Sequence, residues 1–266
     1  MRCVIVIPAR YASSRFPGKP LAGIMGKPMI RHVYERACES SLSDMVIVAT
    51  DDVRVFESVE AFGGRALMTS AIHQSGTDRV AEVIKDLQCD VVVNVQGDEP
   101  LIRGGIIDDC IRLLEDPRAS MGTLKKRIAS YREFFDYAVV KVVTNEEGFA
   151  LYFSRAPIPF YRDHFGAVTH NTAESPVLKE LPGLPELIES GIFVYKHLGI
   201  YSYRRDLLLE LSSLPPSTLE SAERLEQLRA LENGFKIKVK ETTYETIGVD
   251  RPEDIWEVEK WLNTYS

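Results

Sequence analysis

Short apolar runs alternate with helical patterns through the first 115 residues of this chain. Residues 3–7, 45–49 and 91–95 are apolar and rich in β-branched side chains, which predicts strands buried on both faces. A shorter strand is expected at 66–68. Apolar residues recur at helical spacing over 29–40, 55–62, 80–87 and 106–114. This alternation predicts parallel βαβ units, and therefore an α/β fold with a doubly wound, mostly parallel sheet.

The pattern changes at about residue 120, after which strands dominate. Strands are expected over 121–128, 138–143, 150–153, 197–203 and 237–239, and helices over 207–211, 219–231 and from Pro252 onward. Residues 161–196 contain three prolines and three glycines and show weak periodicity, so we expect a long excursion there rather than core. The second half is therefore expected to add a smaller, mixed subdomain to the sheet.

Composition is that of an ordinary soluble globular protein, with 45% hydrophobic and 27% charged residues over 266 positions. The formal net charge of −7 argues against general nucleic-acid binding, so any basic site has to be local. No apolar stretch approaches the length of a membrane span, which argues against a membrane protein. The four cysteines show no C-x-x-C spacing, so we expect buried free thiols and a cytoplasmic location.

The sequence contains one such local basic site, in the loop after the first predicted strand. The first predicted strand stops at Pro8, and three cations follow within ten residues: Arg10, Arg15 and Lys19. A basic loop after a buried strand is typical of phosphate binding at the carboxyl edge of an α/β sheet, and these charges can balance much of a nucleoside triphosphate. The loop matches neither the P-loop pattern nor G-x-G-x-x-G. Each cation can alternatively be a solvated surface residue.

Acidic residues also stand where predicted strands end. Asp98 follows the strand at 91–95, and Asp250 follows a short apolar stretch near the end of the sequence. A carboxylate beside a buried strand is costly unless it is paired or binds a metal, and Mg²⁺ takes such oxygens. Capping of the next helix is the alternative role for both. Asp51 and Asp52 end another strand, and for these we favour capping.

A polar loop at 73–79 leads into the helix expected near residue 80. Thr77 or Asp78 can cap that helix. The backbone of Ser75 and Gly76 can pair with a nucleotide base, and Arg79 can donate to a base carbonyl oxygen. Recognition of a base edge in this way is selective, because a wrong base leaves buried partners unpaired.

Seven stretches together resemble one family, the 3-deoxy-D-manno-octulosonate cytidylyltransferases, also called CMP-Kdo synthetases. The resemblance runs nearly from end to end, with 161–196 as the exception. Its motifs are IPARYASSRFPGKPL (7–21), HQSGTDR (73–79), VNVQGDEP (93–100), LYFSRAPIP (151–159), HLGIYSYR (197–204), ERLEQLR (223–229) and GVDRPEDI (248–255).

The resemblance implies a nucleotide-diphospho-sugar transferase-like fold and a known reaction. The anomeric hydroxyl of the sugar acid Kdo attacks the α-phosphorus of CTP, CMP-Kdo forms for lipopolysaccharide biosynthesis, and diphosphate leaves with the help of Mg²⁺. A homodimer is also implied. Residues 1–266 then form one domain, with nucleotide binding in about 1–120, sugar-acid binding and dimerisation in about 121–235, and a return to the core in 236–266.

The resemblance assigns roles to individual residues. Arg10, Lys19, Asp98 and Asp250 are implied to be catalytic, with both aspartates binding the metal. The remaining nucleotide-binding positions are Ala9, Arg15, His73, Gln74, Ser75, Gly76 and Arg79. The positions for the sugar acid are Gln96, Arg155, His197, Tyr201, Glu226 and Gln227. Arg155 suits the carboxylate, because its planar fork can pair with two oxygens at once.

Three alternatives remain at this stage. The acceptor can be a different 2-keto sugar acid, such as 8-amino-Kdo or a sialic acid. The protein can instead be a metal-dependent glycosyltransferase, since Gly97-Asp98-Glu99 resembles the metal motif of such enzymes. A catalytically silent nucleotide-binding module is disfavoured by the presence of all the cations and both aspartates.

Overall fold

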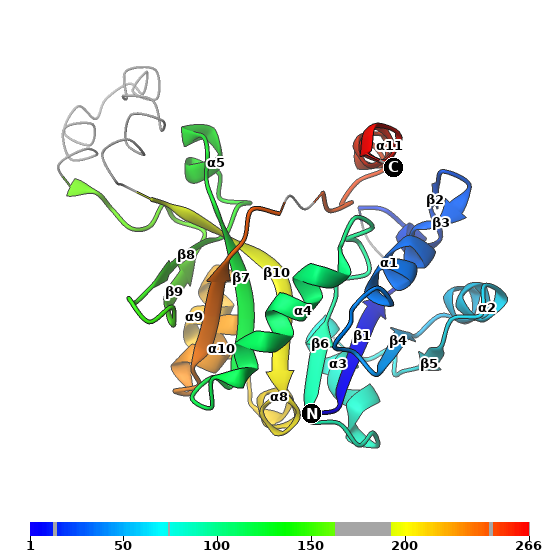
Figure 1. Ribbon diagram of the computed structural model, residues 1–266, viewed down its shortest axis with the longest axis horizontal. Coiled ribbons are helices and arrows are strands. Elements are labelled where there is room, and N and C mark those ends of the chain that lie inside the picture. Colours follow the sequence, from blue (N-terminus) through cyan, green and yellow to red (C-terminus); the bar gives the residue numbers. More distant parts are fainter. Residues whose placement is uncertain (13–14, 74, 163–192, 245–246, 266) are drawn as a thin grey trace. The chain divides into compact units, whose positions relative to one another are not determined.

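The computed structural model describes residues 1–12, 15–73, 75–162, 193–244 and 247–265. The chain divides into two compact units. Unit 1 comprises Met1–Thr123, Gly199–Pro215 and Tyr244–Ser266, and unit 2 comprises Leu124–Leu198 and Pro216–Thr243. Two long strands, β7 (Met121–Arg127) and β10 (Tyr195–Arg204), contribute residues to both units (Figure 1).

Parallel strands form the centre of unit 1. They are β1 (Cys3–Ala9), β4 (Met45–Thr50), β5 (Ala66–Met68) and β6 (Val91–Asn94). β1 lies between β4 and β6, and β5 lies beside β4 (Figure 1). All seven residues of β1 are buried, which explains its unbroken apolar sequence. The parallel sheet predicted for the first half is therefore present, and β10 adds to it by antiparallel pairing with β6.

Helices cover this sheet as the apolar spacing predicts. They are α1 (Met29–Ala37), α2 (Val53–Ala61), α3 (Gly76–Lys85), α4 (Gly104–Arg112) and α8 (Arg205–Ser213), and the 3₁₀ turn η2 (Leu113–Glu115) follows α4. α1 packs on β1 and β4 and also contacts α4, whereas α3 contacts β1, β4, β6 and α8. Figure 1 shows α1 and α4 in front of the sheet strands.

The segment between β1 and α1 is more ordered than the sequence pattern indicates. It contains the 3₁₀ turn η1 (Lys19–Leu21) and a hairpin of two short strands, β2 (Gly23–Ile24) and β3 (Lys27–Pro28). The hairpin packs against the last helix, α11 (Asp254–Tyr265). Ile24, Val258 and Val249 share one buried cluster, so the C-terminal segment is anchored beside the basic loop.

Unit 2 is smaller and mixed, as expected for the second half. Its elements are α5 (Tyr131–Phe135), β8 (Lys141–Thr144), β9 (Ala150–Ser154), α9 (Thr218–Glu223), α10 (Gln227–Glu232) and β11 (Ile237–Glu241). β8 pairs antiparallel with β9, and α10 contacts both α9 and β9. Most of the predicted excursion at 161–196 lies outside the described residues.

The single helix predicted over 219–231 is wrong. Arg224 adopts a left-handed conformation, with φ of 56°, and ends α9 before α10 begins. A hydrogen bond links the two short helices: Arg229 Nε of α10 donates to Glu220 Oε2 of α9 at 2.7 Å. Both side chains are largely buried. Apolar spacing continues across the break, so the pattern alone cannot reveal it. The last helix begins at Asp254 rather than at Pro252.

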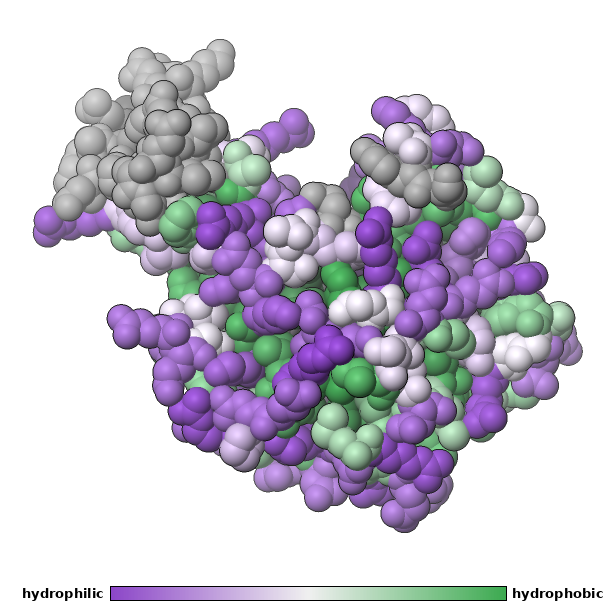
Figure 2. All heavy atoms as spheres, viewed as in Figure 1, coloured by the Kyte–Doolittle hydropathy of each residue, from purple (hydrophilic) through white to green (hydrophobic). Residues whose placement is uncertain are grey.

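The surface agrees with the composition. Figure 2 shows a face covered mainly by hydrophilic residues, with apolar side chains scattered among them. Among the residues that the structure describes, no helix is both long enough and apolar enough to cross a membrane.

Gly104 is expected to be required for stability. A Cβ atom at this position would lie 2.4 Å from the backbone carbon of Glu39, so Gly104→Ala forces α4 away from the segment after α1. We expect a loss of about 1–3 kcal/mol in the free energy of unfolding, measured by urea denaturation. Gly105→Ala is the matched control, because no atom lies within 4 Å of its Cβ position. Equal stability of the two variants would contradict the packing argument.

Candidate active site

A polar cleft of about 350 Å³ lies in unit 1 at the carboxyl end of β1. It is formed by the end of β1 and the basic loop, by the start of α3 and by the segment after β6. The lining residues are Pro8, Ala9, Arg10, Ala12, Arg15, Lys19, Pro20, Gly76, Gln96, Gly97 and Asp98. β1 and β6 are neighbouring parallel strands, so their carboxyl ends meet at one sheet edge, where ligands bind in open α/β sheets.

The three predicted cations all line this cleft. Arg10 is notable because its Nη2 atom is buried and has no hydrogen-bond partner among the described residues. A buried guanidinium nitrogen without a partner is costly, so it favours a bound anion. Gly97 allows the opposite wall to approach closely, since a Cβ atom there would lie 2.9 Å from the backbone oxygen of Pro8.

Lys19 connects the two predicted metal-binding aspartates. Its ammonium group donates to Asp98 Oδ2 at 2.6 Å and to the backbone oxygen of Val249 at 2.9 Å. The same nitrogen lies 3.8 Å from Asp250 Oδ1. Arg15 holds the other oxygen of Asp250, with 3.1 Å between Nη1 and Oδ2. Residues far apart in the sequence thus converge around one ammonium group.

The position of Asp250 is set by its own segment. The backbone amides of Asp250 and Arg251 donate to Asp254 Oδ2 at 2.7 and 2.8 Å, so the first residue of α11 holds the turn that precedes it. The amide of Val249 donates to the backbone oxygen of Asp98 at 2.9 Å. Since Val249 also belongs to the buried cluster with α11, the two aspartates are tied together through the backbone as well as through Lys19.

This donor set fits a magnesium ion. Asp98 and Asp250 supply hard carboxylate oxygens that both lie beside the Lys19 ammonium group, and Mg²⁺ typically takes one or two carboxylates together with phosphate oxygens and water. The described residues contain no group of three or more His, Cys, Asp or Glu that could hold a metal. A cation here therefore needs further oxygens from a bound ligand and from water, as a triphosphate provides.

Glu99 is a partly buried acid that the sequence analysis named only in the motif of the alternative glycosyltransferase. The pKa of its carboxyl is raised to about 8, mainly by burial; the nearby charges of Asp98 and Asp250 add to this rise, and Lys19 opposes it. Its Oε2 atom has no hydrogen-bond partner among the described residues. The signal in the sequence is an acid directly after Asp98 at the end of a buried strand, where exposure to water is limited.

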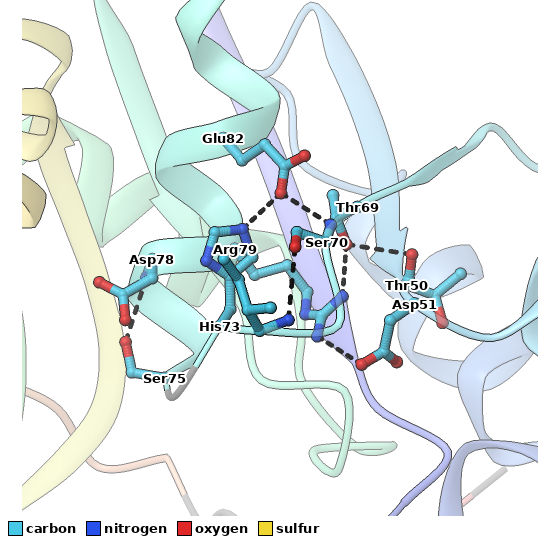
Figure 3. A network of polar contacts seen from close by, with 10 residues as sticks. Thr50, Asp51, Thr69, Ser70, His73, Ser75, Asp78, Arg79 and Glu82 are labelled. Atoms are coloured by element: carbon cyan, nitrogen blue, oxygen red, sulfur yellow. Dashed lines mark hydrogen bonds and ion pairs between the residues drawn. The ribbon is translucent and has the colours of Figure 1, made fainter.

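The loop predicted to hold the base leads into α3. Ser75 caps this helix by accepting from the amide of Asp78 at 3.1 Å, so the expectation that Thr77 or Asp78 is the cap is wrong. Gly76 lines the cleft beside Pro8. His73 is bonded to Glu82 of α3 (Figure 3). Gln74, another predicted contact, lies outside the described residues.

Arg79 lies beneath this loop with its side chain fully buried. Its Nη2 atom donates to Asp51 Oδ2 at 2.8 Å and its Nη1 atom donates to the Thr69 hydroxyl (Figure 3). Asp51 therefore neutralises a buried guanidinium, and the expectation that it caps a helix is wrong. Asp52 does cap α2, by accepting from the amide of Arg54 at 2.9 Å. A buried acid–base pair 28 residues apart leaves no local pattern in the sequence.

Two of the residues predicted to bind the sugar acid lie in unit 1. Gln96 lines the cleft and its Nε2 atom donates to Asn94 Oδ1 at 3.2 Å. Tyr201 lies opposite Asn94 in the pairing of β10 with β6. Asn94 is therefore a neighbour of both residues: its side chain accepts from Gln96, and its backbone lies opposite Tyr201.

The other four, Arg155, His197, Glu226 and Gln227, lie in unit 2. His197 is packed edge-on against Phe153, with 5.1 Å between ring centroids, and burial lowers the pKa of its imidazole to about 3. Gln227 opens α10 and is 5% exposed, and its Nε2 atom has no partner among the described residues. Glu226 directly precedes α10.

Comparison with known proteins places these residues in context. A family model described as "Cytidylyltransferase" matches residues 4–240. The 3-deoxy-manno-octulosonate cytidylyltransferase of Geotalea uraniireducens (strain Rf4) is 53% identical over 259 residues, which is 97% of this chain and 98% of the relative. The enzyme of the same name from Geobacter metallireducens is 51% identical over 266 residues, which is 100% of this chain and 99% of the relative.

Solved structures agree with these sequence matches. The structure of CMP:2-keto-3-deoxy-manno-octonic acid synthetase complexed with CTP is 42% identical, with a TM-score of 0.87 and complete coverage of both chains. This match confirms the predicted α/β fold with a mostly parallel central sheet. A cytidylyltransferase from Leptospira borgpetersenii is 17% identical, with a TM-score of 0.60 over 100% of this chain and 88% of that one, and shows the fold alone.

His197 is expected to make stability depend on pH. Its folded pKa of about 3 lies below the ordinary value of 6.5, so the unfolded chain takes up the proton first as the pH falls. Relative to His197→Gln, the wild type should lose up to about 1.4 kcal/mol of unfolding free energy per pH unit below 6.5. Urea titrations of both proteins at pH 7.5 and pH 5.5 measure this difference. Parallel loss of stability in the two proteins would show that His197 titrates normally.

Proposed function

Because this chain belongs to the 3-deoxy-manno-octulosonate cytidylyltransferase family, we propose that it transfers the cytidylyl group of CTP to Kdo, forming CMP-Kdo and diphosphate. The observation that carries the proposal is the convergence of Lys19, Asp98 and Asp250 in a polar cleft at the carboxyl end of β1. This arrangement suits a highly charged phosphate chain bound together with a divalent cation.

In the proposed reaction, the anomeric hydroxyl of Kdo forms a bond to the α-phosphorus of CTP. The bond from that phosphorus to the oxygen shared with the β-phosphate breaks, and diphosphate leaves with the electron pair. The hydroxyl proton passes to solvent or to a neighbouring base. Such a displacement needs alignment of the two reactants and neutralisation of charge more than covalent help.

The cations of the cleft supply part of this neutralisation. Arg10 presents a buried nitrogen without a protein partner in the described structure, and Arg15 and Lys19 line the same cleft. We assign the three to the triphosphate, with the backbone of Ala9 beside them. Lys19 is already paired with Asp98, so its charge is held in place before any ligand binds.

Asp98 and Asp250 are the residues that would hold Mg²⁺. When bound there, the ion supplies charge neutralisation at the phosphates and helps to fix their orientation. The backbone hydrogen bond from Val249 to Asp98, and the hydrogen bond from the amide of Asp250 to the Asp254 carboxylate, keep the two carboxylates in place.

We assign the cytosine to the loop before α3. His73, Gln74, Ser75 and Gly76 are the proposed contacts, and Gly76 is in the cleft wall. Arg79 is also a proposed contact to the base, and its ion pair with Asp51 holds the guanidinium in place.

On the family resemblance, we assign six residues to the sugar acid. In unit 1 these are Gln96 and Tyr201. In unit 2, Arg155 is proposed to bind the carboxylate, and His197, Glu226 and Gln227 the hydroxyls. A homodimer and a cytoplasmic location complete the proposal, on the basis of the family resemblance.

Assay of the purified protein with CTP, Mg²⁺ and a panel of 2-keto sugar acids tests the proposed function. We expect diphosphate release and a CMP-sugar product with Kdo, and weaker use of UTP, ATP and GTP, because the base edge is recognised through hydrogen bonds. Enzyme-coupled detection of diphosphate and mass spectrometry of the product give the two readouts. Product with 8-amino-Kdo or a sialic acid but none with Kdo would replace the proposed acceptor.

Removal of either metal-binding carboxylate is expected to abolish turnover without unfolding the protein. Asp98→Asn and Asp250→Asn should each lower kcat at least about 100-fold, because a weaker ligand leaves transition-state charge uncompensated. Calorimetric titration of Mg²⁺ into the CTP complex should show that each variant binds the ion more weakly than the wild type does. Asp52→Asn is the control, since Asp52 also ends a strand but caps α2. Turnover within about tenfold of wild type would remove that aspartate from the site.

A further inference from the structure

We propose that Lys141 and Glu223 are positioning residues for the sugar acid, because together they hold the backbone of Arg155 in place. The inference rests on the proposed role of Arg155 in binding the Kdo carboxylate. All three residues belong to unit 2, and neither Lys141 nor Glu223 is among the residues that the family resemblance assigns to the site.

Lys141 is fully buried at the start of β8. Its ammonium group donates to three backbone oxygens: those of Asp136 at 2.8 Å, of Arg155 at 2.7 Å, and of Val139. A buried ammonium group is costly unless it is hydrogen-bonded, and so is a buried backbone oxygen. The three hydrogen bonds therefore hold the ammonium group and the three oxygens in one geometry. The amine therefore connects the segment before β8 to the residue after β9.

Glu223, the last residue of α9, holds the same segment from another direction. Its carboxylate accepts from the backbone amide of Arg155 at 2.9 Å and from the Ser154 hydroxyl at 2.5 Å. The backbone of Arg155 is thus held on both sides, with its oxygen bound by Lys141 and its amide bound by Glu223. Neither bond uses the guanidinium group.

The guanidinium of Arg155 is oriented by neutral groups. Its Nε atom donates to the backbone oxygen of Glu223 at 2.8 Å, and its Nη1 atom donates to the backbone oxygen of Tyr137 at 3.0 Å. Among the described residues, Nη2 makes no hydrogen bond to the protein, and one N–H of Nη1 is also left over. These N–H groups form the fork that pairs with two oxygens of a carboxylate.

The distribution of charge is what distinguishes this arrangement from an ordinary ion pair. The carboxylate of Glu223 accepts from the backbone amide of Arg155 and from the hydroxyls of Ser154 and Tyr152. In the part of the chain that the structure describes, the guanidinium of Arg155 donates to carbonyl oxygens only. Arg155 therefore keeps its positive charge for an incoming anion. Since a misplacement of about 1 Å can cost about 100-fold in rate, the fixed geometry matters for the acceptor and not for CTP.

The test compares steady-state kinetics of Lys141→Met and Glu223→Gln with the wild type. Each variant should raise the KM for Kdo about tenfold or more and leave the KM for CTP within about twofold, because only the acceptor is misplaced. Lys125→Met is the matched control. Lys125 is a half-buried lysine of unit 2 that donates to the Thr144 hydroxyl at 2.8 Å and does not contact Arg155.

Both substitutions are then repeated in an Arg155→Met background. If Lys141 and Glu223 act through Arg155, they add no further increase in the KM for Kdo there. The same increase in that background, an unchanged KM for Kdo in the single variants, or an equal change in Lys125→Met would overturn the proposal. Should Lys141→Met fail to fold, as judged by its thermal transition, Glu223→Gln decides the question by the same criteria.

The experiment separates this inference from the function on which it rests. If Arg155→Met alone leaves the KM for Kdo unchanged, the role of Arg155 fails, and the positioning role fails with it. If Arg155→Met raises that KM but Lys141→Met and Glu223→Gln do not, only the positioning role fails. Absence of CMP-Kdo formation by the wild type would instead contradict the proposed function itself.

Discussion

The ammonium group of Lys19 is the interaction on which the candidate active site depends. Without a positive charge between them, Asp98 and Asp250 would repel each other at the edge of the sheet. Lys19 also binds the backbone oxygen of Val249, so it joins the loop after β1 to the segment before α11. The surrounding structure holds these residues in place. β1 is buried and paired on both sides, and α11 packs on the hairpin after the basic loop.

Two arginines of this protein are held in different ways. The buried guanidinium of Arg79 is neutralised by Asp51, whereas the half-buried guanidinium of Arg155 is held, among the described residues, by carbonyl oxygens. The first arrangement balances the positive charge, so Arg79 suits a neutral acceptor such as a base carbonyl oxygen rather than an anion. The second keeps the charge and fixes only its direction. The identity of its partners therefore indicates whether the charge of an arginine is available to an anionic ligand.

The sequence was sufficient for the parallel strands, for the family and for the basic loop, because each leaves a local pattern. β1, β4 and β6 are continuous apolar runs, and the motifs around Arg10 and Asp98 are contiguous. The break at Arg224 was missed because one left-handed residue does not disturb apolar spacing. The Asp51–Arg79 pair and the bonds of Lys141 were missed because they join positions that only the folded chain brings together.

Unit 1 is assembled from three separate stretches of sequence, and Asp250 lies in the last of them. During synthesis, the strands and the basic loop emerge long before this segment exists. A nascent chain therefore carries the cations of the cleft but only one of the two carboxylates. The second carboxylate arrives when α11 packs on Ile24 and Met29, a closure between opposite ends of the sequence that carries a large loop entropy. Docking of the last helix is thus the step that gives the cleft its complete charge pattern.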